Sequence, residues 1–101
     1  MQRKHIASML RQCEATARVL KHLAHPQRLQ ILCRLSDGEK TVGELADLCG
    51  ASQSLVSQFL SRMKAERLVA CRRDGNFVAY RIEDPKILKL IQALHTIFCP
   101  R

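Results

Sequence analysis

The sequence has few aromatic residues and no long apolar run. Its aromatic residues are one tyrosine and three phenylalanines, and it has no tryptophan. Because 47% of the residues are hydrophobic, aliphatic side chains must supply most of the core. No stretch approaches the roughly 20 apolar residues of a membrane-spanning helix, and the polar-interrupted N-terminal segment lacks the apolar stretch of a signal peptide. We therefore expect a cytoplasmic protein without a membrane segment.

Linkers, internal repeats and low-complexity stretches are also missing. A chain of 101 residues without them is expected to form a single domain over residues 1–101. A domain of this size buries only a limited fraction of its surface, so oligomerisation is one way to complete its core.

Acidic residues are scarce relative to basic ones. The chain has 17 lysines and arginines and 9 acidic residues, which gives a net charge of +8 and a sequence pI near 9.8. Such a balance suits a polyanionic partner such as nucleic acid. Soluble enzymes can also be basic, so the charge alone does not identify the partner.

The cysteine pattern excludes two classes of protein. The number of cysteines is odd, at five, and no secretion signal accompanies them, which argues against a structural disulfide framework. No C-x-x-C motif occurs, which argues against a thiol oxidoreductase. A small thiol-dependent enzyme would also need a nucleophile and a base in one pocket, and no such constellation is visible. We expect free thiols and no enzymatic activity.

Apolar residues at helical spacing predict two helices in the first third of the chain. The second is expected from about Pro26 to Leu35, because proline suits the first position of a helix. The apolar side of the first helix consists of Ile6, Met9, Leu10, Cys13, Ala17, Leu20 and Leu23.

Two more helices follow with clear start and stop signals. Thr41 and Glu44 form a T-x-x-E capping box, and the helix that they begin is expected to end at Gly50. Ser52 is a suitable cap for the fourth helix, which extends to about Glu66. The apolar stripe of this fourth helix consists of Leu55, Val56, Phe59, Leu60 and Met63.

The remainder alternates like two strands and closes with a helix. The strands are expected at residues 68–73 and 77–82, joined by a turn over residues 74–76. Asp84 and Pro85 then begin a final helix with apolar positions at Ile87, Leu88, Ile91, Leu94 and Phe98. The order is ααααββα, a mainly helical fold with a β-hairpin wing, and residues 41–82 predict a winged helix-turn-helix.

Polar and basic residues on the fourth helix and the hairpin form a candidate surface for duplex DNA. In helix-turn-helix docking, the N-terminal part of the second helix enters the major groove, and basic side chains nearby contact phosphates. A polar helical stripe alone is also what a solvated helix face looks like, but the adjacent basic hairpin favours DNA. The predicted DNA-binding residues are Gln53, Ser54, Ser57, Gln58, Ser61, Arg62, Lys64, Arg72, Arg73 and Arg81.

Three segments resemble the arsenical-resistance repressor (ArsR/SmtB) family of bacterial winged-helix regulators. They are HPQRLQILCRL, TVGELADLCGASQSLVSQFLSRMKAERLV and RRDGNFVAYRI, and the resemblance extends from about residue 15 to 99. It implies a homodimer whose interface is built from the first and last helices, with two recognition helices on a palindromic operator. One departure is Phe59, where family members commonly carry histidine; we expect Phe59 to be buried and to alter packing.

Metal sensing is common in the family that the chain resembles, yet both usual metal sites are missing here. The stretch that matches the family's thiolate metal box, residues 42–48, contains no cysteine, and the last helix lacks the usual Asp, His and Glu set. His95 and Cys99 are at helical spacing, but two ligands do not make a site. We predict no metal and no cofactor; a metal-responsive repressor with a non-standard site is the alternative.

Cys33 and Cys99 match the two cysteines of a thiol-sensing branch of this family, the BigR/SqrR/HlyU-like regulators. The resemblance implies that the two thiols lie close enough to be linked by oxidation or by reactive sulfur. The oxidant or the reactive sulfur species would then be the inducer. Cys13, Cys49 and Cys71 are interpreted as packing or incidental thiols, although Cys13 could reach a dimer interface.

The resulting interpretation is a dimeric repressor that binds operator DNA and releases it when Cys33 and Cys99 are linked. The alternative with the same fold is a constitutive DNA-binding regulator without thiol sensing, such as an HlyU-like activator that displaces another DNA-bound protein.

Overall fold

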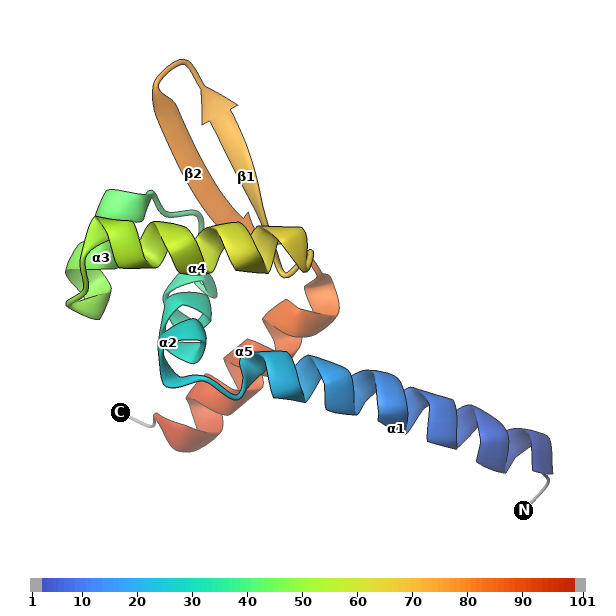
Figure 1. Ribbon diagram of the computed structural model, residues 1–101. Helices are drawn as coiled ribbons and strands as arrows, with labels where there is room; N and C mark the ends of the chain where they lie inside the picture. Colours follow the sequence, from blue (N-terminus) through green and yellow to red (C-terminus); the bar gives the residue numbers. More distant parts are fainter. Residues whose placement is uncertain (1–2, 100–101) are drawn as a thin grey trace.

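Five helices and one hairpin follow one another in the predicted order (Figure 1). The computed structural model describes the backbone of residues 3–99 and the side chains of residues 6–99. The elements are α1 (Arg3–Leu23), α2 (Pro26–Leu35), α3 (Val42–Cys49), α4 (Gln53–Ala65), β1 (Val69–Asp74), β2 (Phe77–Ile82) and α5 (Pro85–Phe98). This arrangement confirms the predicted winged helix-turn-helix of order ααααββα.

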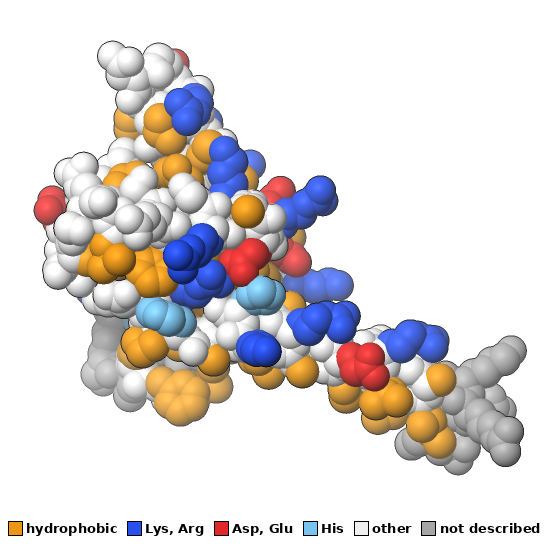
Figure 2. Space-filling model, viewed as in Figure 1, with side chains coloured by type: hydrophobic (Ala, Val, Ile, Leu, Met, Phe, Trp, Pro, Cys, Tyr) orange, Lys and Arg blue, Asp and Glu red, His pale blue; other side chains and the backbone are white. Residues whose placement is uncertain are grey.

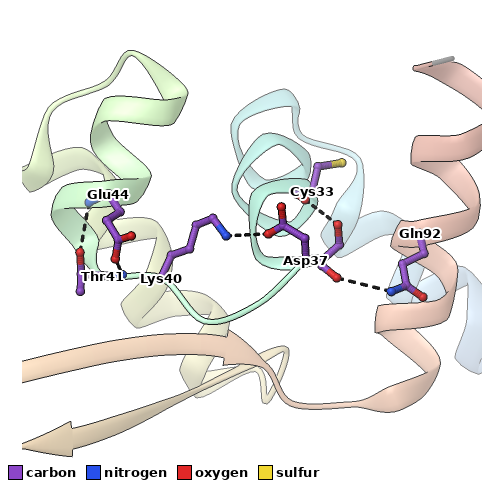
Figure 3. Close-up of polar contacts among 7 residues, drawn as sticks. Cys33, Asp37, Lys40, Thr41, Glu44 and Gln92 are labelled. Atoms are coloured by element: carbon purple, nitrogen blue, oxygen red, sulfur yellow. Dashed lines mark hydrogen bonds and ion pairs between the residues drawn. The ribbon is translucent and has the colours of Figure 1, made fainter. Parts of the chain in front are cut away.

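Local hydrogen bonds fix the ends of the helix-turn-helix as the sequence predicts. The Thr41 hydroxyl accepts from the Glu44 amide at 3.1 Å, and the Glu44 carboxylate accepts from the Thr41 amide at 3.0 Å (Figure 3). Gly50 ends α3 with a φ of 63°, a conformation that glycine adopts at little cost. The Ser52 hydroxyl then accepts from the Leu55 amide at 3.1 Å and starts α4. These caps therefore mark the start of α3, its end and the start of α4.

One hydrophobic core lies beneath α4 and is shared by α2, α3, β1 and α5. All buried side chains among the described residues are hydrophobic. Phe59 is among them, with 8% of its surface exposed, as the sequence predicts. The largest fully buried side chains are Ile31, Leu32, Leu45, Val56, Leu60, Met63, Val69 and Ile91.

The wing is a two-stranded antiparallel hairpin that projects from the body beside α4 (Figure 1). Asp74 pairs with Phe77, so the turn is one residue shorter than the sequence suggested. Gly75 has a φ of 62°, which lets a two-residue turn match the twist of the strands. Lys40 adds a bridge to Tyr80, with backbone hydrogen bonds of 3.0 and 2.8 Å. This bridge joins the base of the wing to the loop before α3.

α1 extends away from the rest of the chain, and its apolar side remains uncovered (Figures 1 and 2). Leu23 at its end is buried, whereas the exposed fractions of Ile6, Met9, Leu10 and Leu20 range from 44% to 59%. At the end of α5, Phe98 is 74% exposed. No helix among the described residues is long and apolar enough to cross a membrane.

Candidate DNA-binding surface and thiol pair

The outward side of α4 gathers half of the predicted DNA-binding residues. These side chains are all exposed, because the opposite side of the helix packs into the core. They line one shallow hollow, formed by Ser54, Ser57, Gln58, Ser61 and Arg62. Hydroxyl and amide groups in such a row can donate to and accept from base edges, and the guanidinium can contact phosphate. We call this set the α4 face.

Gln53 and Lys64 lie at the borders of the α4 face rather than within it. The Gln53 amide nitrogen lies 3.6 Å from the position that a β-carbon on Gly43 would occupy, so this side chain lies over the start of α3. The Lys64 ammonium donates to the Cys71 sulfur at 3.2 Å, so Lys64 is directed toward the wing. The sequence predicted both residues as DNA contacts, with Gln53 near the start of the helix and Lys64 as a phosphate contact toward its end.

The three predicted arginines of the wing are exposed but lie on two faces of the hairpin. In the strand register, Arg72 and Arg81 share one face, since side chains alternate along a strand. Arg73 lies on the other face together with Cys71, whose sulfur accepts from Lys64 of α4. Arg73 therefore belongs to the side of the wing that is continuous with α4.

Arg72 has an acidic partner that the sequence did not reveal. Its Nε and Nη2 atoms each donate to the Glu39 carboxylate at 3.2 Å, and its guanidinium lies 5.5 Å from the centre of the Phe77 ring. The hydrogen bonds that Arg72 donates to Glu39 raise the pKa of its guanidinium. The Glu39 carboxylate thus offsets the charge of Arg72 and engages two of its five N–H donors.

Two ion pairs on one carboxylate join α1, α2 and the end of α4. One oxygen of the Glu66 carboxylate lies 2.7 Å from Arg28 Nη1, and the other lies 2.7 Å from His22 Nδ1. Glu66 follows directly after α4, Arg28 belongs to α2 and His22 to α1. These ion pairs thus connect the helix that carries the α4 face to the two helices that precede the helix-turn-helix.

Cys33 and Cys99 occur on two helices that pack against each other. Cys33 is half-buried on α2, and Cys99 is exposed at the end of α5. The Gln92 amide of α5 donates to the Ser36 carbonyl at 3.4 Å, next to Cys33, whose sulfur points toward the side of α2 on which α5 lies (Figure 3). Burial raises the pKa of the Cys33 thiol, and the nearby Cys99 thiolate raises that pKa further, while Arg34 lowers it. Both thiols are free in this structure.

Cys13 and Cys49 have surroundings separate from those of Cys33 and Cys99. Cys13 is exposed in a hollow along α1, together with Met9 and Leu20. Cys49 is half-buried at the end of α3, and burial raises its pKa.

Within the part of the chain that the structure describes, no three His, Cys, Asp or Glu side chains are placed to hold a metal ion.

Comparison with known proteins gives consistent matches along the chain. Residues 25–70 match a family model described as "Bacterial regulatory protein, arsR family". The biofilm growth-associated repressor of Xylella fastidiosa is 38% identical over 91 residues, which are 90% of this chain and 80% of that protein. The HTH-type transcriptional regulator YgaV of Escherichia coli is 38% identical over 96 residues, which are 94% of this chain and 97% of that protein.

The fold agrees equally well with a solved structure. The transcriptional regulator HlyU from Vibrio vulnificus superposes with a TM-score of 0.89 at 33% identity, over 94% of this chain and 99% of that one. The similarity therefore includes α1, α5 and the wing as well as the helix-turn-helix.

Proposed function

This chain belongs to the arsR family of bacterial regulatory proteins and is a transcriptional regulator rather than an enzyme. From that premise we propose how it binds DNA and how it releases it. In the proposal it is a homodimeric repressor that binds operator DNA in the cytoplasm. Linkage of Cys33 to Cys99, by an oxidant or by reactive sulfur, releases the DNA.

The α4 face and the wing support operator DNA as the ligand. The α4 face presents three hydroxyls, one amide and one guanidinium on an exposed helix, the donor and acceptor types that read base edges in the major groove. Arg73 and Lys64 border this face with positive charge, which suits the phosphates on either side of the groove. Repression is supported by the relative from Xylella fastidiosa, which is a repressor by name.

The uncovered apolar surfaces of α1 and α5 support a homodimer. Leu10 on α1 and Ile97 and Phe98 on α5 are between 59% and 74% exposed. Burying them against a second copy removes apolar area from water, which stabilises association by roughly 25 cal/mol for each Å². Two α4 helices related by a twofold axis would then contact two half-sites of a palindromic operator.

The packing of α2 against α5 is the observation that carries the thiol switch. Contacts between the two helices and the effect of Cys99 in raising the pKa of the Cys33 thiol both support proximity of the two thiols. Closing a disulfide further requires the two Cα atoms to come within roughly 4.4–6.8 Å. Cys99 is exposed, so its thiolate reacts with the oxidant first. Cys33 then attacks the oxidised sulfur of Cys99.

The chemistry balances with a peroxide as oxidant. The Cys99 thiolate attacks one peroxide oxygen and becomes a sulfenic acid as hydroxide leaves. The Cys33 thiolate then displaces hydroxide from that sulfur, so the two thiols lose two protons and two electrons and the peroxide is reduced to water. A polysulfide serves in the same way: the Cys99 thiolate takes up its terminal sulfur atom as the shortened polysulfide leaves, and the Cys33 thiolate then displaces hydrosulfide from the Cys99 sulfur to close the disulfide.

Linkage of Cys33 to Cys99 would lower the affinity for DNA by shifting α2 relative to α5. α5 carries part of the proposed dimer surface, and Arg28 on α2 is joined to Glu66 at the end of α4. A shift of α2 relative to α5 therefore changes the distance between the two α4 helices in the dimer. Because both half-sites are read together, a small change in that distance weakens both contacts.

A single experiment tests the proposal. Reduced protein is used to select a duplex from a random DNA pool, and the affinity is measured before and after treatment with hydrogen peroxide or sodium tetrasulfide. Intact mass spectrometry on the same samples detects the loss of two hydrogens or the gain of sulfur. We expect the treated protein to lose affinity in proportion to the linked fraction.

Cysteine variants identify the thiols involved. Cys33→Ser and Cys99→Ser should bind the selected duplex normally and remain bound after treatment, whereas Cys13→Ser should respond like the wild-type protein. Release by either of the first two variants would place the switch elsewhere. Equal affinity of the reduced and linked wild-type forms would favour a constitutive regulator without thiol sensing.

A further inference from the structure

We propose that a basic hollow between α1, α2 and α4 is a second phosphate-binding surface, which holds the operator backbone beside the segment that α4 reads. The inference rests on the proposed DNA binding and adds a surface that neither the helix-turn-helix nor the wing provides. The hollow is lined by Arg18, Lys21, His22, His25, Arg28 and Arg62.

Three helices build this basic hollow. α1 contributes Arg18 and Lys21 from its last two turns, α2 contributes Arg28 and α4 contributes Arg62. The hollow is open to solvent. Phe59 also lines the hollow, and its ring lies 5.1 Å from that of His25.

The charges of the basic hollow are largely uncompensated. Among the side chains described for residues 6–99, Arg18, Lys21 and Arg62 form no ion pair. Glu66 is the acidic group at its edge, and its two oxygens are already held by Arg28 and His22 at 2.7 Å. Like charges that converge without acidic partners repel one another, and a polyanion lying across them relieves that repulsion.

The basic hollow is continuous with the α4 face. Arg62 lines both, and Figure 2 shows basic and histidine side chains between α4 and α1 on the same side of the molecule as the polar surface of α4. A duplex that lies on the α4 face therefore passes over the hollow. Because the basic hollow and the α4 face lie on the same side, the DNA backbone is favoured as the ligand of the hollow. An acidic protein in the hollow would compete with DNA for this side of the molecule.

The proposal predicts a sequence-independent contribution to binding. Phosphate contacts position a protein on the duplex without reading bases. Each neutralised phosphate contributes about −0.9 to the slope of log affinity against log salt. Losing Arg18 and Lys21 should therefore flatten this slope by about 0.9 for each lost contact and weaken selected and random duplexes by the same factor.

A matched pair of double variants tests the proposal. Arg18→Gln with Lys21→Gln removes two charges from the hollow, and Lys86→Gln with Lys89→Gln removes two from exposed positions on α5. Fluorescence anisotropy of the reduced proteins is measured on one selected and one random duplex over a range of salt concentrations. Hydroxyl-radical footprinting shows which backbone positions are protected, and thermal unfolding shows that both variants are folded.

We expect the α1 variant to lose affinity several-fold on both duplexes, with a flatter salt slope and a footprint shortened beside the α4 contact. The α5 variant should match the wild-type protein in all three measurements. An α1 variant with the same slope and footprint as the α5 variant would overturn the proposal and leave the basic hollow as the contact for an acidic protein. If the wild-type protein itself binds no duplex, the proposed function fails, and this inference fails with it.

Discussion

The Arg72 guanidinium donates two hydrogen bonds to the Glu39 carboxylate, both 3.2 Å long. Arg72 belongs to β1, and Glu39 lies in the loop between α2 and α3. The pair therefore holds the wing against the body at the same end where Lys40 bridges Tyr80. It also offsets one of the positive charges that the wing would otherwise offer to DNA.

Replacing Glu39 should strengthen DNA binding. Glu39→Gln removes the acidic partner and leaves Arg72 free to contact a phosphate, so affinity should rise several-fold and the salt slope should steepen by about 0.9. Anisotropy titrations over a range of salt concentrations measure both quantities. Glu83→Gln removes the same charge from an exposed position after β2 and serves as the control. Weaker binding by Glu39→Gln would mean that the pair matters chiefly for orienting the wing.

Gln58 and Arg73 should have different roles, with Gln58 reading bases and Arg73 binding phosphate. Gln58 lies in the centre of the α4 face, so Gln58→Ala should weaken the selected duplex by about 1–3 kcal/mol and random DNA hardly at all. Arg73 lies on the side of the wing that is continuous with α4, and Arg73→Gln should weaken both duplexes equally. Titration of each variant against both duplexes measures the division, and equal losses for both variants would contradict it.

The sequence located the elements well because their ends depend on neighbouring residues. Pro26, Thr41, Gly50 and Ser52 each act within a few positions of the chain, and each lies in the structure at the helix end where the sequence placed it. The hairpin turn was one residue too long in the prediction, because a glycine at positive φ permits a tighter turn than the composition alone suggests.

Contacts between distant parts of the chain could not be predicted in the same way. Arg72 and Glu39 are 33 positions apart, and Arg28 and Glu66 are 38 apart. Periodicity identified the apolar side of α1 correctly, but it could not show that this side stays uncovered within one chain. The basic hollow was also invisible, since its residues come from three helices whose mutual packing no local pattern reveals.

Loss of the α4 cap should reduce the stability of the fold. Ser52→Ala removes the hydroxyl that accepts from the Leu55 amide at 3.1 Å, which should lower the free energy of unfolding by about 1 kcal/mol. For a chain of this size the melting temperature should fall by roughly 4–8 °C. Ser52→Asn, which can accept the same hydrogen bond, should retain most of the stability. A Ser52→Ala protein as stable as the wild type would show that tertiary packing alone holds the start of α4.

A charge on the apolar side of α1 should prevent the proposed dimer. Leu10 is 59% exposed in one chain, so Leu10→Glu should leave the fold intact while opposing burial against a second copy. Sedimentation equilibrium should then give the mass of one chain, whereas the wild-type protein gives twice that mass. Leu48→Glu changes an apolar residue of α3 that is 41% exposed, and it should remain a dimer. A dimeric Leu10→Glu protein would move the interface away from this part of α1.

The reactivity of Cys33 should depend on pH through Cys99. Burial raises the pKa of the Cys33 thiol, and the Cys99 thiolate raises it further because a second negative charge nearby is unfavourable. The thiolate is the reactive form, so alkylation of Cys33 by iodoacetamide should be slow at neutral pH and accelerate only above the usual thiol range near about 8.5. In Cys99→Ser the neighbouring charge is gone, so the pKa of Cys33 should fall and its alkylation profile should move to lower pH. Mass spectrometry of peptides from timed alkylation of the reduced proteins measures the rate at each pH, with Cys13→Ser as the control variant. Identical profiles for the wild-type and Cys99→Ser proteins would show that the two thiols do not interact in solution, and a direct bridge between them would then lose its physical basis.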